Sequence, residues 1–260
     1  MANNSLHTAL AYIKWLPKTF HLHGIHSPFI FKLEKEVLRG KSDPSISQQL
    51  YAYKKSLLDN QQTITVTDYG AGSRVFKSAE RKIKDIATYA GATHKRILLL
   101  QRLIAYFQPQ EVLELGTSLG IATAALAIKS NAQVTSIEGC PQTAQIAQQE
   151  LDNAGIKNVK ICVGDFTTEL DNHIKKNFDF IYFDGNHARD ATINYVNKLL
   201  ATVSDESVWV FDDIHWSQEM TEAWEYIKAL PQVTATIDAF YFGMVFFRPK
   251  QAKEDFYIKL

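Results

Sequence analysis

The sequence has few of the features that mark secreted, membrane or nucleic-acid-binding proteins. It holds only two cysteines, Cys140 and Cys162, which offer no disulfide framework and fit a reducing compartment. It has no apolar run of transmembrane length and no secretory signal at its start. Lys plus Arg and Asp plus Glu both number 28, so the formal net charge is zero. We therefore expect a cytoplasmic protein with no membrane or nucleic-acid partner.

The dinucleotide-binding fingerprint G-x-G-x-x-G is also absent. A G-x-x-x-G turn, residues 116–120, instead joins a short apolar strand, 111–115, to a helix-prone segment, 121–129. The glycines of such a turn let the backbone approach a ligand, and the helix start offers unpaired N–H groups. Glu114 lies just before the turn, where a carboxylate repels phosphate but suits the ammonium and sulfonium of S-adenosylmethionine. An ordinary strand–helix turn is the alternative.

Five successive predicted strands end in acidic residues or in loops that carry them. The acidic residues are Glu114, Glu138, Asp165, Asp184 and the pair Asp212-Asp213. Ligands of open α/β sheets bind beyond the carboxyl ends of the strands, where these side chains would gather. Glu138 comes about 20 residues after the glycine turn, the position from which a carboxylate accepts ribose hydroxyl hydrogen bonds.

The later acids point to two further roles. Asp165-Phe166 can bind and cover an adenine, although Phe166 is equally suited to core packing. Asp184, Asp212 and Asp213 form an oxygen-only set that suits Mg²⁺, Mn²⁺ or Ca²⁺. The alternative is that Asp212 or Asp213 caps the next helix and that Asp184 bonds to a loop.

The chain divides into a helical N-terminal extension, 1–89, and an α/β domain, 90–260. We expect helices over 5–16, 28–40, from 44 onward, 90–107, 121–129, 141–154, 190–200 and 218–230. We expect strands over 111–115, 133–137, 158–163, 178–183, 208–211, 234–238 and 241–247, and an extended segment over 61–67. The last two strands are nearly contiguous, which predicts a hairpin and an antiparallel final strand.

Two features of the extension imitate binding sites. His21, His23 and His26 are close enough in sequence to bind a metal, but a polar connection before a helix is the simpler interpretation. Residues 68–74, with Gly70-Ala71-Gly72, resemble a nucleotide loop, but a charged segment follows them. We interpret them as a loop that borders the active site.

The motifs LELGTSLGIATAALA, SIEGCPQTAQIAQ, VGDF, FDFIYFDGNH and WVFDDIH occur in this order. Through them the chain resembles class I S-adenosylmethionine-dependent methyltransferases, and among these the small-molecule O-methyltransferases related to catechol and caffeoyl-CoA O-methyltransferase. The resemblance implies a Rossmann-like α/β fold with a seven-stranded, mostly parallel sheet, an antiparallel last strand and helices on both faces. It implies a cofactor site of Glu114, Gly116, Thr117, Ser118, Gly120, Ile121, Glu138, Gly139, Cys140, Asp165, Phe166 and Asp184.

The resemblance also assigns catalytic roles, with two departures from the family pattern. Asp184, Asp212 and Asp213 match the metal ligands, but the family usually has Asn where this chain has Asp213. His187 stands where the family has its catalytic Lys, three residues after Asp184. We expect His187 to be the general base, with a loop residue or an extra metal ligand as alternatives.

The acceptor is not written in the sequence, and a small molecule is our expectation. Aromatic residues that would line its pocket, or belong to the core instead, are Tyr51, Tyr53, Tyr69, Trp216 and Phe240. The helical extension would shape that pocket or support a homodimer. Two other functions stay open: an NAD-linked oxidoreductase, and a non-catalytic S-adenosylmethionine-binding protein.

Overall fold

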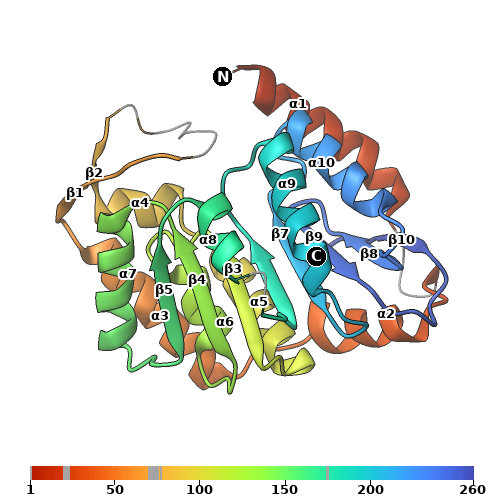
Figure 1. Ribbon diagram of the computed structural model, residues 1–260, viewed down its shortest axis with the longest axis horizontal. Coiled ribbons are helices and arrows are strands. Elements are labelled where there is room, and N and C mark those ends of the chain that lie inside the picture. The colour runs from red at the N-terminus through yellow and green to blue at the C-terminus, as the bar shows by residue number, and fades with distance from the viewer. Residues whose placement is uncertain (1, 20–23, 70–75, 77, 174–175) are drawn as a thin grey trace. The chain divides into compact units, whose positions relative to one another are not determined.

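The computed structural model describes residues 2–19, 24–69, 76, 78–173 and 176–260 (Figure 1). The chain forms two compact units, one of residues 1–39 and 170–260 and the other of residues 40–169. The division falls inside helix α8 (Phe166–His173), which is one continuous helix. The extension and α/β domain expected from the sequence divide the chain elsewhere, and the roles assigned to them stay predictions.

Residues 40–169 contain a parallel sheet whose strand order is β3-β4-β5. Its strands are β3 (Glu111–Leu115), β4 (Gln133–Glu138) and β5 (Val159–Val163). The helices are α3 (Pro44–Asp59), α4 (Ile83–Tyr89), α5 (His94–Phe107), α6 (Ile121–Ala127) and α7 (Pro141–Asn153). A separate antiparallel pair is formed by β1 (Thr63–Thr65) and β2 (Glu80–Lys82).

Local sequence signals explain where several of these helices begin. Asp43 caps α3 by accepting hydrogen bonds from the amides of Ser45 and Ile46, at 2.8 and 3.1 Å. Pro44 occupies the first turn, where no amide is needed. Thr93 caps α5, which therefore starts later than the sequence pattern predicted.

The other unit contains five strands in the order β10-β8-β9-β7-β6. They are β6 (Phe180–Phe183), β7 (Val208–Asp212), β8 (Ala235–Asp238), β9 (Phe242–Phe246) and β10 (Glu254–Tyr257). The helices are α1 (Ala2–Trp15), α2 (Pro28–Leu33), α9 (Arg189–Leu199) and α10 (Gln218–Ala229). Short 3₁₀ turns cover Leu16–Lys18 and Leu200–Thr202, and a π-helical turn, Glu34–Leu38, extends α2.

The predicted α/β class with a mostly parallel sheet is confirmed, and so is the antiparallel hairpin of β8 and β9. Four strands and α-helices were not predicted. Strand β2 and helix α4 lie in the charged segment after residue 74, for which no element was expected. Strand β10 follows the hairpin and pairs parallel with β8, so the antiparallel strand β9 is not the last one. Helix α8 follows β5. It was missed because its sequence, FTTELDNH, is mostly polar, and Leu170 is its one fully buried residue.

Helix α1 belongs to the unit that contains β6 to β10 and is hydrogen-bonded to it. The Trp15 indole N–H donates to the carbonyl of Asp238 at 3.3 Å, and the Thr8 hydroxyl donates to the carbonyl of Trp216 at 3.3 Å. Phe240, considered above as a pocket residue, is 2% exposed and packs on the rings of Tyr12 and Trp15. It therefore belongs to the core that holds α1.

Among the described residues, no helix has the length and apolar character needed to cross a membrane.

Candidate functional site

The glycine turn after β3 contains three residues with positive φ angles, a backbone conformation that glycine adopts most easily. Gly116 and Gly120 have φ angles of 108° and 74°, and Ser118 has a φ of 48°. The Tyr53 hydroxyl donates to the carbonyl of Leu119 at 3.0 Å, and it lies 2.5 Å from where a Cβ on Gly120 would stand. Tyr53, one of the candidate pocket aromatics, is thus a buried support beneath the turn.

The Glu138 carboxylate, at the end of β4, joins this turn to the start of α7. Its Oε2 accepts from the Ser118 amide at 2.7 Å and its Oε1 from the Cys140 amide at 2.8 Å. Burial raises the pKa of this carboxyl group, and the two amides partly offset that effect. Thr143 and the backbone of Gly139 also stabilise the ionised form. A carboxylate has about four acceptor positions, so it can bond to the protein and to a ligand hydroxyl at the same time.

The segment after Glu138 is approached by an aromatic ring. A Cβ on Gly139 would stand 2.6 Å from Cδ2 of Tyr69, so the glycine lets the ring lie against the backbone. Tyr69 is 59% exposed. The predicted loop after it, Gly70 to Arg74, lies outside the described residues, and only Asp68 and Tyr69 of that motif can be placed.

Glu114 lies deeper than the sequence suggested. Its side chain is fully buried, and its Oε2 accepts from the hydroxyls of Thr123 and Ser136 at 2.5 Å each. Its Oε1 has no hydrogen-bond partner within the described part of the chain. Burial raises the pKa of Glu114 to about 8. A nearby cation would favour the ionised form, so an unpartnered buried oxygen fits a site for a cationic ligand.

The remaining predicted cofactor residues lie around the same strand ends. Thr117 is buried and hydrogen-bonded to Ser136, and Ile121 begins α6 with its side chain buried. Asp165 starts α8, where its Oδ1 accepts from the amides of Thr167 and Thr168 at 2.8 and 3.3 Å. The sequence did not predict this capping role, because α8 itself was missed.

Asp184 and His187 meet in the loop after β6. Oδ1 of Asp184 lies 3.7 Å from Nε2 of His187, and the Tyr182 hydroxyl donates to Oδ2 of Asp184 at 3.2 Å. The His187 ring centroid lies 5.9 Å from that of Trp216. His187 has a left-handed φ of 38°, a strained value for a residue other than glycine. The imidazole is about a quarter exposed, which suits a group that exchanges protons.

Asp212 and Asp213 end β7 in a tight turn. Oδ1 of Asp212 accepts from the Asp213 amide at 2.9 Å, and Asp213 has a φ of 53°. Helix α10 is capped by Ser217, whose hydroxyl accepts from the Met220 amide. The alternative role of these acids as helix caps is therefore wrong.

The carboxylates of Asp184, Asp212 and Asp213 do not form a converged metal-binding group. In the described ranges, the His, Cys, Asp and Glu side chains whose ligand atoms lie within 4.8 Å of one another belong to a different set. A single ion needs its ligands to converge, so these three residues give no geometry from which a metal step can be derived. Their metal role stays a prediction, and His21 and His23 of the histidine motif lie outside the described residues.

Several residues that hold the predicted site residues in place were not found from the sequence. Thr123 and Ser136 hold Glu114, and Tyr182 holds Asp184. Thr123 is a buried polar residue in the otherwise apolar helix α6, and that signal could have revealed it. Ser136 stands among other polar residues of β4 and gave no such signal.

Residues 113–214 match the model of a protein family described as a methyltransferase domain. A curated relative, human EEF1A lysine methyltransferase 2, is 26% identical over 150 residues, which are 51% of this chain and 64% of that protein. The match therefore spans just under two thirds of the relative's length.

Solved structures share the fold. The SAH-bound methyltransferase PaMTH1 of Podospora anserina has a TM-score of 0.60 at 12% identity, covering 86% of this chain and 97% of that one. An O-methyltransferase of Bacillus cereus in complex with SAH has a TM-score of 0.54 at 16% identity, covering 87% and 100%. The resemblance drawn from the sequence motifs is confirmed.

Proposed function

We propose that this chain, which has a methyltransferase domain and the class I methyltransferase fold, transfers the methyl group of S-adenosylmethionine to a small-molecule hydroxyl. The observation that carries the proposal is the Glu138 carboxylate, held by the amides of Ser118 and Cys140 beside a glycine turn. This arrangement suits a ribose diol.

The cofactor, when bound, supplies an electrophilic methyl group on a sulfonium. Glu138 would accept hydrogen bonds from its ribose hydroxyls. The unpartnered Oε1 of Glu114 supports a role for that residue and the glycine turn in holding the cationic methionine end. Asp165 and Phe166 would border the adenine, at the start of α8.

His187 is the proposed general base. An imidazole can take a proton near neutral pH without a large change in its pKa. Asp184 would orient the ring, since Oδ1 of Asp184 lies 3.7 Å from Nε2 of His187, and would stabilise the charge that the ring gains. Thr8 and Trp216 support the proposal that the extension shapes the acceptor pocket, because α1 bonds to the carbonyl of a residue beside His187.

Divalent-metal assistance is the finer part of the proposal. Asp184, Asp212 and Asp213 supply only oxygen ligands, which is the donor chemistry of Mg²⁺ sites. Since these carboxylates do not converge, we assign no reaction step to the ion, and proton removal rests on His187 alone.

A second candidate is methylation of a protein lysine. It is favoured by the relative whose name assigns it that activity, at 26% identity. The two candidates differ in the atom that receives the methyl group, which is an oxygen in the first and a lysine nitrogen in the second. Both acceptors must lose a proton to a base. The G-x-G-x-x-G turn typical of NAD-linked oxidoreductases is absent from the sequence, which argues against that third function.

The test is a methyl-transfer assay with isotopically labelled S-adenosylmethionine and mass-spectrometric detection. Acceptors would be a panel of phenols and catechols and, separately, a lysine-containing protein, each with Mg²⁺ and with EDTA. Label on a phenolic oxygen supports the proposal, and loss of that label in EDTA supports its metal part. Label only on lysine would replace it with the second candidate. Cofactor binding with no labelled product in any arm would favour a non-catalytic binding protein.

A further inference from the structure

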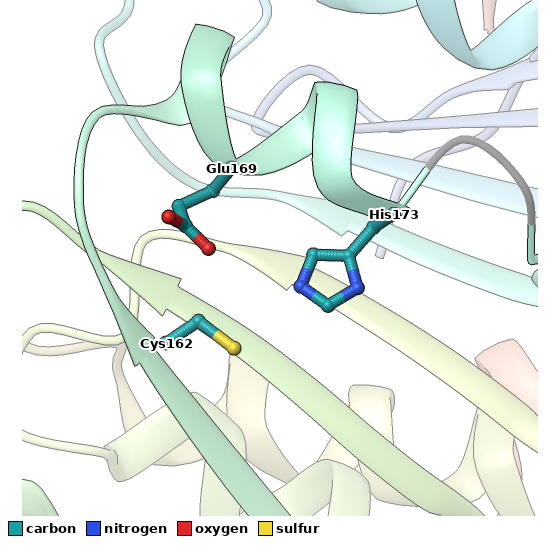
Figure 2. Close-up of side chains that lie close together, drawn as sticks. All are labelled: Cys162, Glu169 and His173. Atoms are coloured by element: carbon teal, nitrogen blue, oxygen red, sulfur yellow. The ribbon is translucent and has the colours of Figure 1, made fainter.

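Three potential metal ligands converge outside the site described above. Cys162 lies on β5, and Glu169 and His173 lie on α8, all within one continuous segment of the chain (Figure 2). One ligand atom from each residue lies within 4.8 Å of the other two. Glu169 and His173 are four residues apart, so they share one face of the helix. Figure 2 shows that both side chains point from α8 towards the strand that carries Cys162.

The local backbone makes room for this arrangement. A Cβ on Gly164 would stand 2.9 Å from Cγ and 3.0 Å from Oε1 of Glu169. Any larger residue at position 164 would therefore displace the carboxylate from its place above the backbone. Asp165 caps the start of α8 through the amides of Thr167 and Thr168, which fixes the direction of the helix. Gly164 and the Asp165 cap together allow the Glu169 side chain to lie close to Cys162.

The donor atoms indicate which ion would bind. A thiolate, an imidazole and a carboxylate form a mixed S, N and O set, which Zn²⁺ accepts in tetrahedral geometry with one position left for water. Mg²⁺ and Ca²⁺ take oxygen ligands and would not select a thiolate. This set is thus chemically distinct from the aspartates after β6 and β7.

The thiolate is the form of cysteine that binds metal ions, so an ion that binds at Cys162 must displace the thiol proton. Cys162 is partly buried, so water and ions can still reach it.

We propose that Cys162, Glu169 and His173 form a binding site for Zn²⁺ or a similar borderline transition-metal ion. The ion would tie β5 to α8 across the turn that contains Asp165 and Phe166. Because those two residues are the proposed adenine contacts, occupation of the site would fix the start of α8 next to the cofactor. The site itself does not depend on the proposed methyl transfer.

Titration of the full chain, without an affinity tag, with Co²⁺ tests the proposal. Thiolate coordination to Co²⁺ gives a near-ultraviolet charge-transfer band, and tetrahedral geometry gives intense visible bands. We expect both sets of bands at one ion per chain, and their loss when Zn²⁺ is added. The apparent Co²⁺ affinity should rise with pH because binding releases the thiol proton.

Three variants test the ligands separately. Cys162→Ser should abolish the charge-transfer band, and Glu169→Gln and His173→Gln should each weaken Co²⁺ binding at least about tenfold. Circular dichroism and the urea midpoint would verify that each variant is folded. If one variant is unfolded, the other two still test the site.

Two control variants keep the proposal open to contradiction. Cys140→Ser removes the other cysteine, and His26→Gln removes an exposed histidine of the N-terminal motif. Both should keep the charge-transfer and visible bands of the wild-type chain. Bands that persist in Cys162→Ser, that vanish in either control, or that never form in the wild type would overturn the proposal.

Discussion

The backbone amide of Ser118 donates a 2.7 Å hydrogen bond to Oε2 of Glu138, which joins the turn after β3 to the end of β4. The two residues are 20 positions apart in the sequence, and the parallel pairing of β3 with β4 brings them together. Ser118, the donor, has a left-handed φ of 48°. The conformation of the turn and the proposed ribose contact thus involve the same side chain, that of Glu138.

Substitution of Gly120 by alanine should be more harmful than substitution of Gly155. Both glycines have a left-handed φ, 74° and 72°, which costs an alanine about 1–2 kcal/mol. A Cβ on Gly120 would also stand 2.5 Å from the Tyr53 hydroxyl, whereas one on Gly155 meets nothing within 4 Å. Urea unfolding should therefore give a free energy of unfolding lower by at least about 1 kcal/mol for Gly120→Ala than for Gly155→Ala.

Tyr53→Phe provides the internal check on that comparison. In the Gly120→Ala background it removes the overlapping hydroxyl, and part of the lost stability should return. In the wild-type background it removes the bond to the Leu119 carbonyl and should destabilise the chain by about 1 kcal/mol. Equal losses for the two glycine variants, with no recovery in the double variant, would contradict the close approach.

Glu114 should make the free energy of unfolding fall as pH rises. Its pKa is raised from an ordinary 4.5 to about 8, so between these values the folded chain holds a proton that the unfolded chain has lost. The stabilisation is complete below pH 4.5 and is lost as pH rises through 8. Urea unfolding of wild type and Glu114→Gln across this range should show a flatter dependence in the variant. Parallel pH profiles would mean that Glu114 ionises normally inside the fold.

His187→Ala should lower kcat by about 10²–10⁴-fold while SAH binding stays within a factor of two to three. Asp184→Ala should abolish activity, because it removes both the partner of the imidazole and a predicted metal ligand. Asp190→Asn, an exposed acid paired with Arg189 on α9, is the matched control and should keep wild-type turnover. Full turnover of Asp184→Ala at saturating Mg²⁺ would remove Asp184 from the mechanism.

The sequence was most informative where residue type and position in the fold are tightly linked. The turn of residues 116–120 and the acid at Glu138 were found because a strand, a turn and a helix in this order need glycine and place a carboxylate predictably. The strand β10 and the helix α8 were missed because their short polar segments carry no strong period.

The metal question shows the limit of the same reasoning. Sequence order brings Asp184, Asp212 and Asp213 to strand ends, but loop conformation decides where carboxylate oxygens point, and Asp213 takes a left-handed φ of 53°. Conversely, nothing in the sequence indicated that Cys162, Glu169 and His173 lie together. The packing of helix α8 against strand β5 brings them together in the structure. Side-chain convergence is a property of backbone angles that residue types alone do not fix.

Isothermal titration with SAH tests the proposed cofactor site most directly, with wild type, Glu138→Gln and the exposed control Asp152→Asn. We expect micromolar binding by wild type and the control, and about 10–100-fold weaker binding by Glu138→Gln, which keeps the shape of the side chain but loses its charge. Wild-type affinity in Glu138→Gln, or no binding of SAH by the wild-type chain, would contradict the assignment of this turn and carboxylate to S-adenosylmethionine.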